Sequence, residues 1–237
     1  MKIRRVLSVF LLSVLLTALC LTPQALALEA PSLDAKCALL MDETAGRMLY
    51  GHNEKEKAYP ASITKIMTAI VALDSGVPLD STVTVSQEAA QVGESSASLW
   101  AGDTLTLEAA LAGLMIPSGN DAAIAIAETL GEGMKTDDSQ TANEAFVAAM
   151  NAKAAELGMT ETLFSNPHGL DIGAYDNEMY SCARDVALMS AYAMENETFR
   201  SIVSKESAQI TVTRADGKPQ VIDLQSTDRL LGTYAVS

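Results

Sequence analysis

Basic residues, histidine and cysteine are all scarce in this 237-residue chain. It has 16 Lys and Arg against 30 Asp and Glu, a formal net charge of −14, two histidines and three cysteines. Such an acidic surface excludes the proteins that bind nucleic acid through a basic face. His52 and His168 lie far apart in the sequence, and we assign a structural role to both. The chain also lacks internal repeats and low-complexity linkers.

The N-terminus has the layout of a secretory signal peptide. Three basic residues precede an apolar run at 6–21, and an A-x-A cleavage sequence follows at 25–27. The run is shorter than the ~20 apolar residues that span a bilayer, which disfavours the alternative of an uncleaved membrane anchor. We therefore predict a signal peptide over 1–27 and an exported protein that begins near Leu28. The loss of three basic residues would change the formal charge from −14 to −17.

Cysteine use in the predicted mature protein does not indicate a disulfide framework. Cys20 leaves with the signal peptide, so only Cys37 and Cys182 remain. A single bridge stays open in an exported protein, but two buried free thiols are the favoured interpretation. The remaining length of about 210 residues suits one domain, over 28–237.

Strand patterns lie near both ends of the chain, and helical patterns lie between them. The predicted strands are 37–42, 47–52, 82–86, 208–212 and 220–224. The predicted helices are 62–73, 105–115, 122–130, 143–157, 182–194 and 198–203. Thr104 or Thr106 suits the N-cap of the second helix. The order predicts an α+β fold whose terminal strands meet in one antiparallel sheet.

A serine precedes a lysine by one helical turn at the start of the first predicted helix, in Y-P-A-S-I-T-K. Residues three apart share one helix face, so Ser62 and Lys65 can come into contact. A serine hydroxyl needs a base within hydrogen-bond reach to act as a nucleophile, and Lys65 is the candidate base. The S-x-x-K pattern by itself is common by chance, so a second motif is needed.

The second motif is Ser118-Gly119-Asn120, in a break between two apolar helices. This break can place two polar side chains in a cleft, where Ser118 could pass a proton and Asn120 could bind Lys65 and a substrate amide. Burial beside these groups would lower the proton affinity of the lysine. The alternative is that Ser118 and Asn120 only cap the helix that starts near Asp121.

The pairing of S-I-T-K with P-S-G-N-D in an exported chain resembles the penicillin-recognising serine enzymes, whose motifs are S-x-x-K, S-x-N and K-T-G. Residues 59–69, 102–123 and 164–171 resemble the D-alanyl-D-alanine carboxypeptidases (peptidase S11) of the low-molecular-weight penicillin-binding protein class. The resemblance runs from about Ala30 to the last residue. It implies an α+β fold of the serine β-lactamase/DD-peptidase type, with an antiparallel sheet packed against a helical cluster.

The resemblance also implies the roles of the site residues. Ser62 would be the nucleophile, Lys65 its general base, Ser118 the proton relay and Asn120 the residue that orients the substrate. They would release the last D-alanine of a peptidoglycan stem peptide ending in D-Ala-D-Ala, through an ester on Ser62. No metal or other cofactor is implied, and β-lactam antibiotics would be covalent inhibitors. The expected location is the outer face of the cytoplasmic membrane, the cell wall or the periplasm.

The sequence departs from the family pattern near its end. Residues 225–234 resemble the segment that leads to the K-T-G strand, yet no K-T-G follows before Ser237. In the family that strand holds the terminal carboxylate of the substrate. We therefore expect the catalytic domain at 28–237 to be truncated at its C-terminus and the isolated chain to be nearly inactive. Membrane attachment would require residues beyond Ser237.

Two other functions stay open. A class A β-lactamase-like hydrolase would share the serine and lysine, but we find no convincing counterpart of its deacylating glutamate, and its middle motif is S-D-N. A non-catalytic cell-wall binding protein on the same fold is the other alternative. The intact Ser62, Lys65, Ser118 and Asn120 argue against a decayed site, and turnover of a D-Ala-D-Ala peptide separates the two.

Overall fold

The computed structural model describes residues 31–42, 44, 46–172 and 178–231. Two units divide the chain, Met1–Ala35 and Lys36–Ser237. In the first unit the described residues 31–35 are exposed and form no helix or strand. The predicted signal peptide at 1–27 lies outside the described residues. None of the helices within the described ranges is long and apolar enough to cross a membrane.

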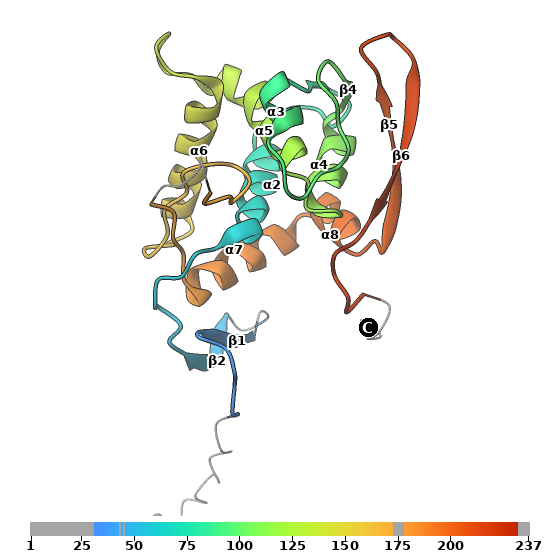
Figure 1. Cartoon of the computed structure of the whole chain (residues 1–237). Helices are drawn as coiled ribbons and strands as arrows, with labels where there is room; N and C mark the ends of the chain where they lie inside the picture. Colours follow the sequence, from blue (N-terminus) through green and yellow to red (C-terminus); the bar gives the residue numbers. More distant parts are fainter. Residues whose placement is uncertain (1–30, 43, 45, 173–177, 232–237) are drawn as a thin grey trace, which may run out of the picture. The chain divides into compact units, whose positions relative to one another are not determined.

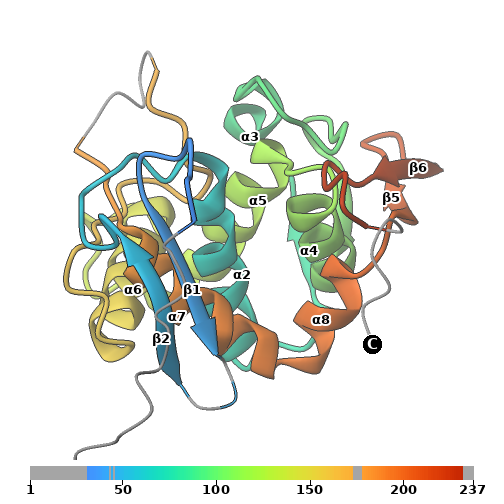
Figure 2. The same cartoon turned by 90° about the horizontal axis from the view of Figure 1, so that it is seen from below.

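Among the described residues of the second unit, helices contain more residues than strands. The helices are η1 (Ala61–Ile63), α2 (Thr64–Asp74), α3 (Gln87–Gln91), α4 (Leu107–Met115), α5 (Asn120–Gly131), η2 (Glu132–Met134), α6 (Ala142–Glu156), α7 (Ala183–Glu195) and α8 (Glu197–Val203). Helix α2 packs against α4, α5, α6 and α7, and it lies among them in Figures 1 and 2. Eight of its eleven residues are buried. A helix that is apolar on all sides belongs inside a protein, and α2 therefore carries its first-turn residues into the interior.

The strands form two antiparallel sheets rather than the single sheet expected. They are β1 (Ala38–Asp42), β2 (Arg47–His52), β3 (Thr82–Thr84), β4 (Thr104–Thr106), β5 (Ser207–Thr213) and β6 (Pro219–Gln225). One sheet is β1-β2, and the other has the order β3-β4-β5-β6. The two hairpins that carry the terminal strands are seen apart from each other in both Figure 1 and Figure 2.

The prediction of one sheet was wrong because the two hairpins pack on different helices. In β5 the alternate residues Ile210 and Val212 are buried, and the strand packs against α4 and β4. Strand β1 packs against α7 and has no fully buried residue. Alternation in the sequence identifies a strand and its buried face, but it does not identify the partner of that face.

Most predicted elements are confirmed with shifted ends. Thr106 caps α4, since its side chain accepts a hydrogen bond from the N–H of Ala109 at 3.1 Å. Helix α6 is followed by Gly158, whose φ of +73° suits the residue after a helix end. Strand β4 and the short helix α3 were not predicted. Both are too short for a hydrophobic period to repeat, since α3 has five residues and β4 has three.

Both cysteines of the second unit are free thiols. Cys182 is buried, and Cys37 is half-buried. The preference for free thiols over a bridge is therefore confirmed, although only one of the two is fully buried.

Candidate active site

Ser62 and Lys65 lie at the junction between η1 and α2. Ser62 sits in the 3-10 turn rather than in the α-helix, and Lys65 is in the first turn of α2. The Lys65 Nζ and Ser62 Oγ atoms are 3.1 Å apart, within hydrogen-bonding distance. Ser62 is exposed, whereas Lys65 is 1% exposed. A buried amine thus contacts a hydroxyl that a substrate can reach, as the spacing predicted.

Burial changes the proton affinity of Lys65. It lowers the pKa of Lys65 from 10.5 to about 8, while the nearby carboxylate of Asp121 acts in the opposite direction. Desolvation disfavours the charged ammonium, so an unprotonated amine is accessible a little above neutral pH. Only that form can accept the proton of the Ser62 hydroxyl.

A loop formed by residues 164–170 contacts the Ser62 turn through backbone carbonyls. Lys65 Nζ donates to the carbonyl of His168 at 2.8 Å, and Thr68 Oγ1 donates to the carbonyl of Pro167 at 2.6 Å. The hydroxyl of Tyr59 donates to the carbonyl of Gly169 at 2.7 Å. Three consecutive carbonyls are therefore held against the residues that flank the serine.

Asn166 gives this loop its shape. Its Oδ1 accepts from the N–H of His168 at 3.2 Å and of Gly169 at 2.6 Å, and its Nδ2 donates to the carbonyl of Leu170 at 2.9 Å. Asn166 was not singled out from the sequence, although a buried Asn in an Asn-Pro-His-Gly turn is a signal that could have identified it.

The two histidines differ in position. His168 is 1% exposed, and burial together with the charge of Lys65 lowers its pKa to about 3, so the imidazole is neutral at physiological pH. Its backbone carbonyl accepts the hydrogen bond from Lys65. His52 is exposed on β2. The structural role assigned to His168 thus includes a direct contact with the candidate base.

Ser118 and Asn120 lie where α4 passes into α5, and both helices pack on α2. Ser118 is half-buried, with a φ of +63°. Helix α5 begins at Asn120, its N-cap is Gly119, and no side chain caps it. The capping alternative is therefore wrong. A Cβ on Gly119 would lie 2.6 Å from the carbonyl oxygen of Gly113, so this turn requires glycine.

Asn120 is held by a second loop rather than by Lys65. It is 1% exposed, its Nδ2 donates to the carbonyl of Gly93 at 3.0 Å, and its backbone N–H donates to the carbonyl of Ser95 at 2.8 Å. Among the described residues its Oδ1 has no partner. No hydrogen bond in the described part of the chain joins Ser118 or Asn120 to Lys65, so their roles in the reaction stay predictions.

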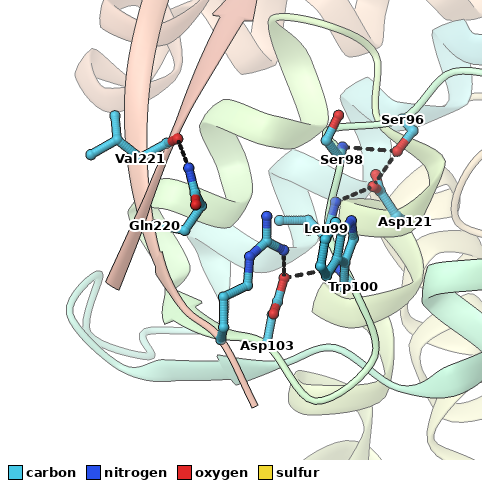
Figure 3. A network of polar contacts seen from close by, with 9 residues as sticks. Ser96, Ser98, Leu99, Trp100, Asp103, Asp121, Gln220 and Val221 are labelled. Carbon is cyan, nitrogen blue, oxygen red and sulfur yellow. Dashed lines mark hydrogen bonds and ion pairs between the residues drawn. The ribbon is translucent and has the colours of Figure 1, made fainter. Parts of the chain in front are cut away.

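Asp121, the next residue, ties the loop to α5, a role that the sequence did not indicate. Its carboxylate accepts from the N–H of Ala97 at 2.9 Å, the N–H of Leu99 at 3.1 Å and the hydroxyl of Ser96 at 2.6 Å. Figure 3 shows the carboxylate of Asp121 between Ser96 and Leu99. Asp121 is 1% exposed, so this network fixes the loop that binds Asn120.

Among the described residues, potential metal ligands do not cluster around Ser62 and Lys65. Within the described ranges no group of three or more His, Cys, Asp or Glu side chains could hold a metal ion. The contact between Ser62 and Lys65 is the arrangement that nucleophilic catalysis with a lysine base requires. Ser118 and Asn120, at the junction of α4 and α5, are the additional polar residues that the sequence predicted.

The chain matches a known protein family and several of its characterised members. The family model described as D-alanyl-D-alanine carboxypeptidase, peptidase S11, matches residues 24–235. The chain is 38% identical over 169 residues to the D-alanyl-D-alanine carboxypeptidase DacF of Bacillus subtilis, which covers 70% of this chain and 40% of that protein. It is 36% identical over 188 residues to DacC of Escherichia coli, with 75% and 44% covered. The chain thus spans less than half the length of these two relatives.

Solved structures agree with the sequence matches. The crystal structure of the Streptomyces K15 DD-transpeptidase matches with a TM-score of 0.77 and 30% identity, over 88% of this chain and 79% of that one. The same α+β fold, with helices and antiparallel sheets, is therefore present in both proteins.

Proposed function

This chain belongs to the peptidase S11 family of D-alanyl-D-alanine carboxypeptidases, and from this premise we propose that it removes the terminal D-alanine from peptidoglycan stem peptides. The observation that carries the proposal is the 3.1 Å contact between buried Lys65 Nζ and exposed Ser62 Oγ. Membership makes a serine-type DD-peptidase the expected activity. The substrate and the roles of the residues are our proposal.

The proposed first step forms an ester. The unprotonated amine of Lys65 takes the Ser62 proton as Oγ attacks the carbonyl carbon of the penultimate D-alanine. The backbone N–H of Ser62 donates to the developing oxyanion, an interaction typically worth about 3 kcal/mol. Ser118 passes the proton to the departing amine, so the C–N bond breaks and D-alanine leaves. Asn120 orients the substrate amide through its side chain.

Water completes the reaction by attacking the ester on Ser62, which releases the shortened peptide and returns the proton to the serine. A β-lactam would form the same ester without a separate leaving group. Among the described residues no carboxylate is hydrogen-bonded to Ser62 or Lys65. A class A β-lactamase deacylates with a glutamate that acts through a water, and the sequence has no convincing counterpart of that glutamate, so we infer that penicillin inhibits this protein rather than serving as its substrate.

The proposed location is outside the cytoplasm, in the cell wall or at the outer face of the membrane. The signal peptide pattern at 1–27 and the peptidoglycan substrate support it. Secretion of the protein by its native host, with an N-terminus near Leu28 found by sequencing, is the expected result.

Fluorescent penicillin tests the nucleophile directly. The protein is expressed from its complete gene, labelled, digested and mapped by mass spectrometry. We expect one label on Ser62, none in Ser62→Ala, and full labelling in Ser204→Ala, which removes an exposed hydroxyl at the end of α8. Release of D-alanine from a peptide ending in D-Ala-D-Ala is measured in parallel. A folded protein that takes no label on Ser62 would refute the proposal.

A further inference from the structure

A cavity of about 620 Å³, which Ser62 does not line, lies between the loop at 100–103 and the turn of the β5–β6 hairpin. Its lining combines charged and amide side chains with Trp100, two alanines and a proline. The lining residues that matter here are Trp100, Asp103, Arg214, Asp216, Lys218 and Gln220. Nothing in the proposed reaction uses this cavity.

Trp100 presents its ring to solvent but does not move freely. It is the only tryptophan of the chain, and it is 65% exposed. The guanidinium of Arg214 lies 4.2 Å from the ring centre, and the same guanidinium pairs with the buried carboxylate of Asp103. Asp103 Oδ2 also accepts from the backbone N–H of Trp100 at 2.8 Å (Figure 3). One face of the indole is thus backed by a cation, and the ring remains largely exposed.

Backbone contacts fix the position of the loop and the hairpin turn that form the cavity. Gly102 has a φ of +83°, and a Cβ there would lie 3.0 Å from the Cβ of Ala215 in the hairpin turn. The N–H of Gly102 donates to the carbonyl of Val85 at 2.8 Å, and the N–H of Val85 donates to the carbonyl of Asp103 at 2.9 Å. A preformed cavity loses little entropy when a ligand binds.

Charge in the cavity is balanced within the protein. Arg214 pairs with Asp103, and Lys218 pairs with Asp216 at 2.6 Å. Two bases and two acids leave no net charge for an ionic ligand. Within the described residues Asp103 Oδ1, itself in a side chain 1% exposed, has no hydrogen-bond partner. The cavity therefore offers the exposed part of the Trp100 ring, together with carboxylate, ammonium and amide groups, to a neutral ligand rich in hydroxyls.

We propose that this cavity binds a pyranose ring of a glycan chain, and specifically the glycan that carries the stem peptides. The face of an aromatic ring is electron-rich, so the partly positive C–H groups on one side of a pyranose stack on it. The hydroxyls at the ring edge donate to carboxylates and accept from amide and ammonium groups, which Asp216, Gln220 and Lys218 supply. The choice of glycan rests on the proposed function.

The cavity lies within reach of the Ser118-Gly119-Asn120 junction. The carbonyl of Ser95 accepts from the N–H of Asn120 at 2.8 Å, and Trp100 is five residues further along. A fully extended chain spans at most about 3.6 Å per residue, so Trp100 is no more than ~18 Å from Ser95. A stem peptide of five residues spans a similar length. One substrate molecule could therefore place its sugar on Trp100 and extend its peptide to the Ser118-Gly119-Asn120 junction.

Trp100 itself reports on the site, because it is the only tryptophan among these 237 residues. We expect a saturable change of its emission on titration with peptide-free glycan strands of the cell wall, and a weaker one with N-acetylglucosamine tetramer. Maltotetraose and a sugar-free D-Ala-D-Ala peptide should cause no comparable change. The Ser62→Ala variant should behave like the parent protein, which separates binding at this cavity from the peptidase reaction.

Retention on insoluble, peptide-free glycan gives a readout for variants that lack the fluorophore. Trp100→Ala should bind at least tenfold more weakly, and Trp100→Phe should be intermediate, both with unchanged circular dichroism spectra. Met48→Ala, which removes an exposed apolar side chain from β2, is the matched control and should bind as the parent does. If Trp100→Ala fails to fold, Trp100→Phe and the fluorescence titration decide the matter.

Two outcomes would overturn the site: no saturable emission change with any glycan, or equal glycan binding by the parent and by folded Trp100 variants. An equal response to the sugar-free peptide would also overturn it. If the protein binds glycan through Trp100 but releases no D-alanine from any peptide, the proposed function fails while the glycan site stands.

Discussion

Gly169 lies directly against the carbonyl oxygen of Ala61, the residue before the candidate nucleophile. A Cβ built on Gly169 would be 1.9 Å from that oxygen, a steric clash that only a backbone shift could relieve. On its other side, the carbonyl of Gly169 accepts from Tyr59. The 164–170 loop and the turn that carries Ser62 are therefore packed backbone to backbone, and neither can shift without the other.

Gly169→Ala should destabilise the protein and slow its acylation. The φ of +88° alone makes alanine unfavourable by about 1–2 kcal/mol, and the clash with Ala61 adds to this. Chemical denaturation and the rate of penicillin labelling measure the two effects. Gly217→Ala is the control, since it has a similar φ of +81° with no atom within 4 Å of the added carbon. The Gly217→Ala variant should lose only the stability that the unfavourable φ costs, and penicillin should label it at the rate of the parent protein.

The acylation rate should rise with pH and level off near the pKa of Lys65, which burial lowers to about 8. Below that pH most molecules carry an ammonium that cannot accept the Ser62 proton, so the rate should fall tenfold per pH unit. Lys65→Arg should abolish acylation, because a guanidinium stays protonated throughout this range. A flat profile between pH 6 and 9 in the parent protein would contradict the assignment of Lys65 as the base.

The lowered pKa of Lys65 should also make the unfolding free energy depend on pH. The pKa of Lys65 is lower in the folded protein than the 10.5 of the exposed side chain. The unfolded chain therefore binds more protons between pH 8 and pH 10.5, and the contribution of Lys65 to stability rises with pH across that window. The full difference is on the order of 3 kcal/mol, lost again as pH falls through 8. Comparing unfolding free energies of the parent and Lys65→Met at pH 7.5 and 9.5 isolates this contribution.

The local parts of the site could be predicted from the sequence, and the tertiary parts could not. The contact between Ser62 and Lys65 follows from three-residue spacing at the start of a helix, although the first turn is 3-10. The cap at Thr106 is equally local. By contrast, the bond from Lys65 to the carbonyl of His168 joins residues 103 apart. A backbone carbonyl carries no sequence signature, so that contact needed the structure.

The same distinction explains the sheets. Alternation identified β5 and β6 as strands, because Ile210 and Val212 mark a buried face. Their partners depended on how the helices pack, and β4 meets β5 through the single pair Thr104 and Thr213. A ladder so short leaves no pattern in a sequence, so the pairing of the β5–β6 hairpin with β4 instead of the N-terminal hairpin could not be predicted.

Cysteine modification should distinguish the two free thiols. Cys182 is 2% exposed, and burial raises the pKa of its thiol, so both access and reactivity are low. Cys37 is half-buried. Alkylation of the native protein should therefore mark Cys37 at least tenfold faster, and Cys182 should react at a comparable rate only after denaturation. Peptide mapping reads out each site, and a disulfide-linked peptide joining the two would contradict the structure.

Asp121 connects the loop at 96–99 to the residue that we propose to orient the substrate. Its buried carboxylate accepts four hydrogen bonds, three from that loop and one from the N–H of Ala122 at 2.8 Å. The same charge acts on Lys65 by raising its pKa, against the effect of burial. A purely structural aspartate would affect stability alone, whereas Asp121 should affect stability and the pH profile together.

Asp121→Asn replaces one acceptor oxygen by an amide group that faces N–H donors, so we expect a loss of about 3 kcal/mol in unfolding free energy. Removal of the negative charge should also move the midpoint of the acylation profile to lower pH, because the ammonium of Lys65 loses a stabilising partner. Asp137→Asn is the matched control. That exposed carboxylate accepts only local hydrogen bonds, and its loss should change stability by no more than about 0.5 kcal/mol and leave the midpoint in place. If the midpoint in Asp121→Asn stays where it is in the parent, Asp121 holds the loop without acting on Lys65.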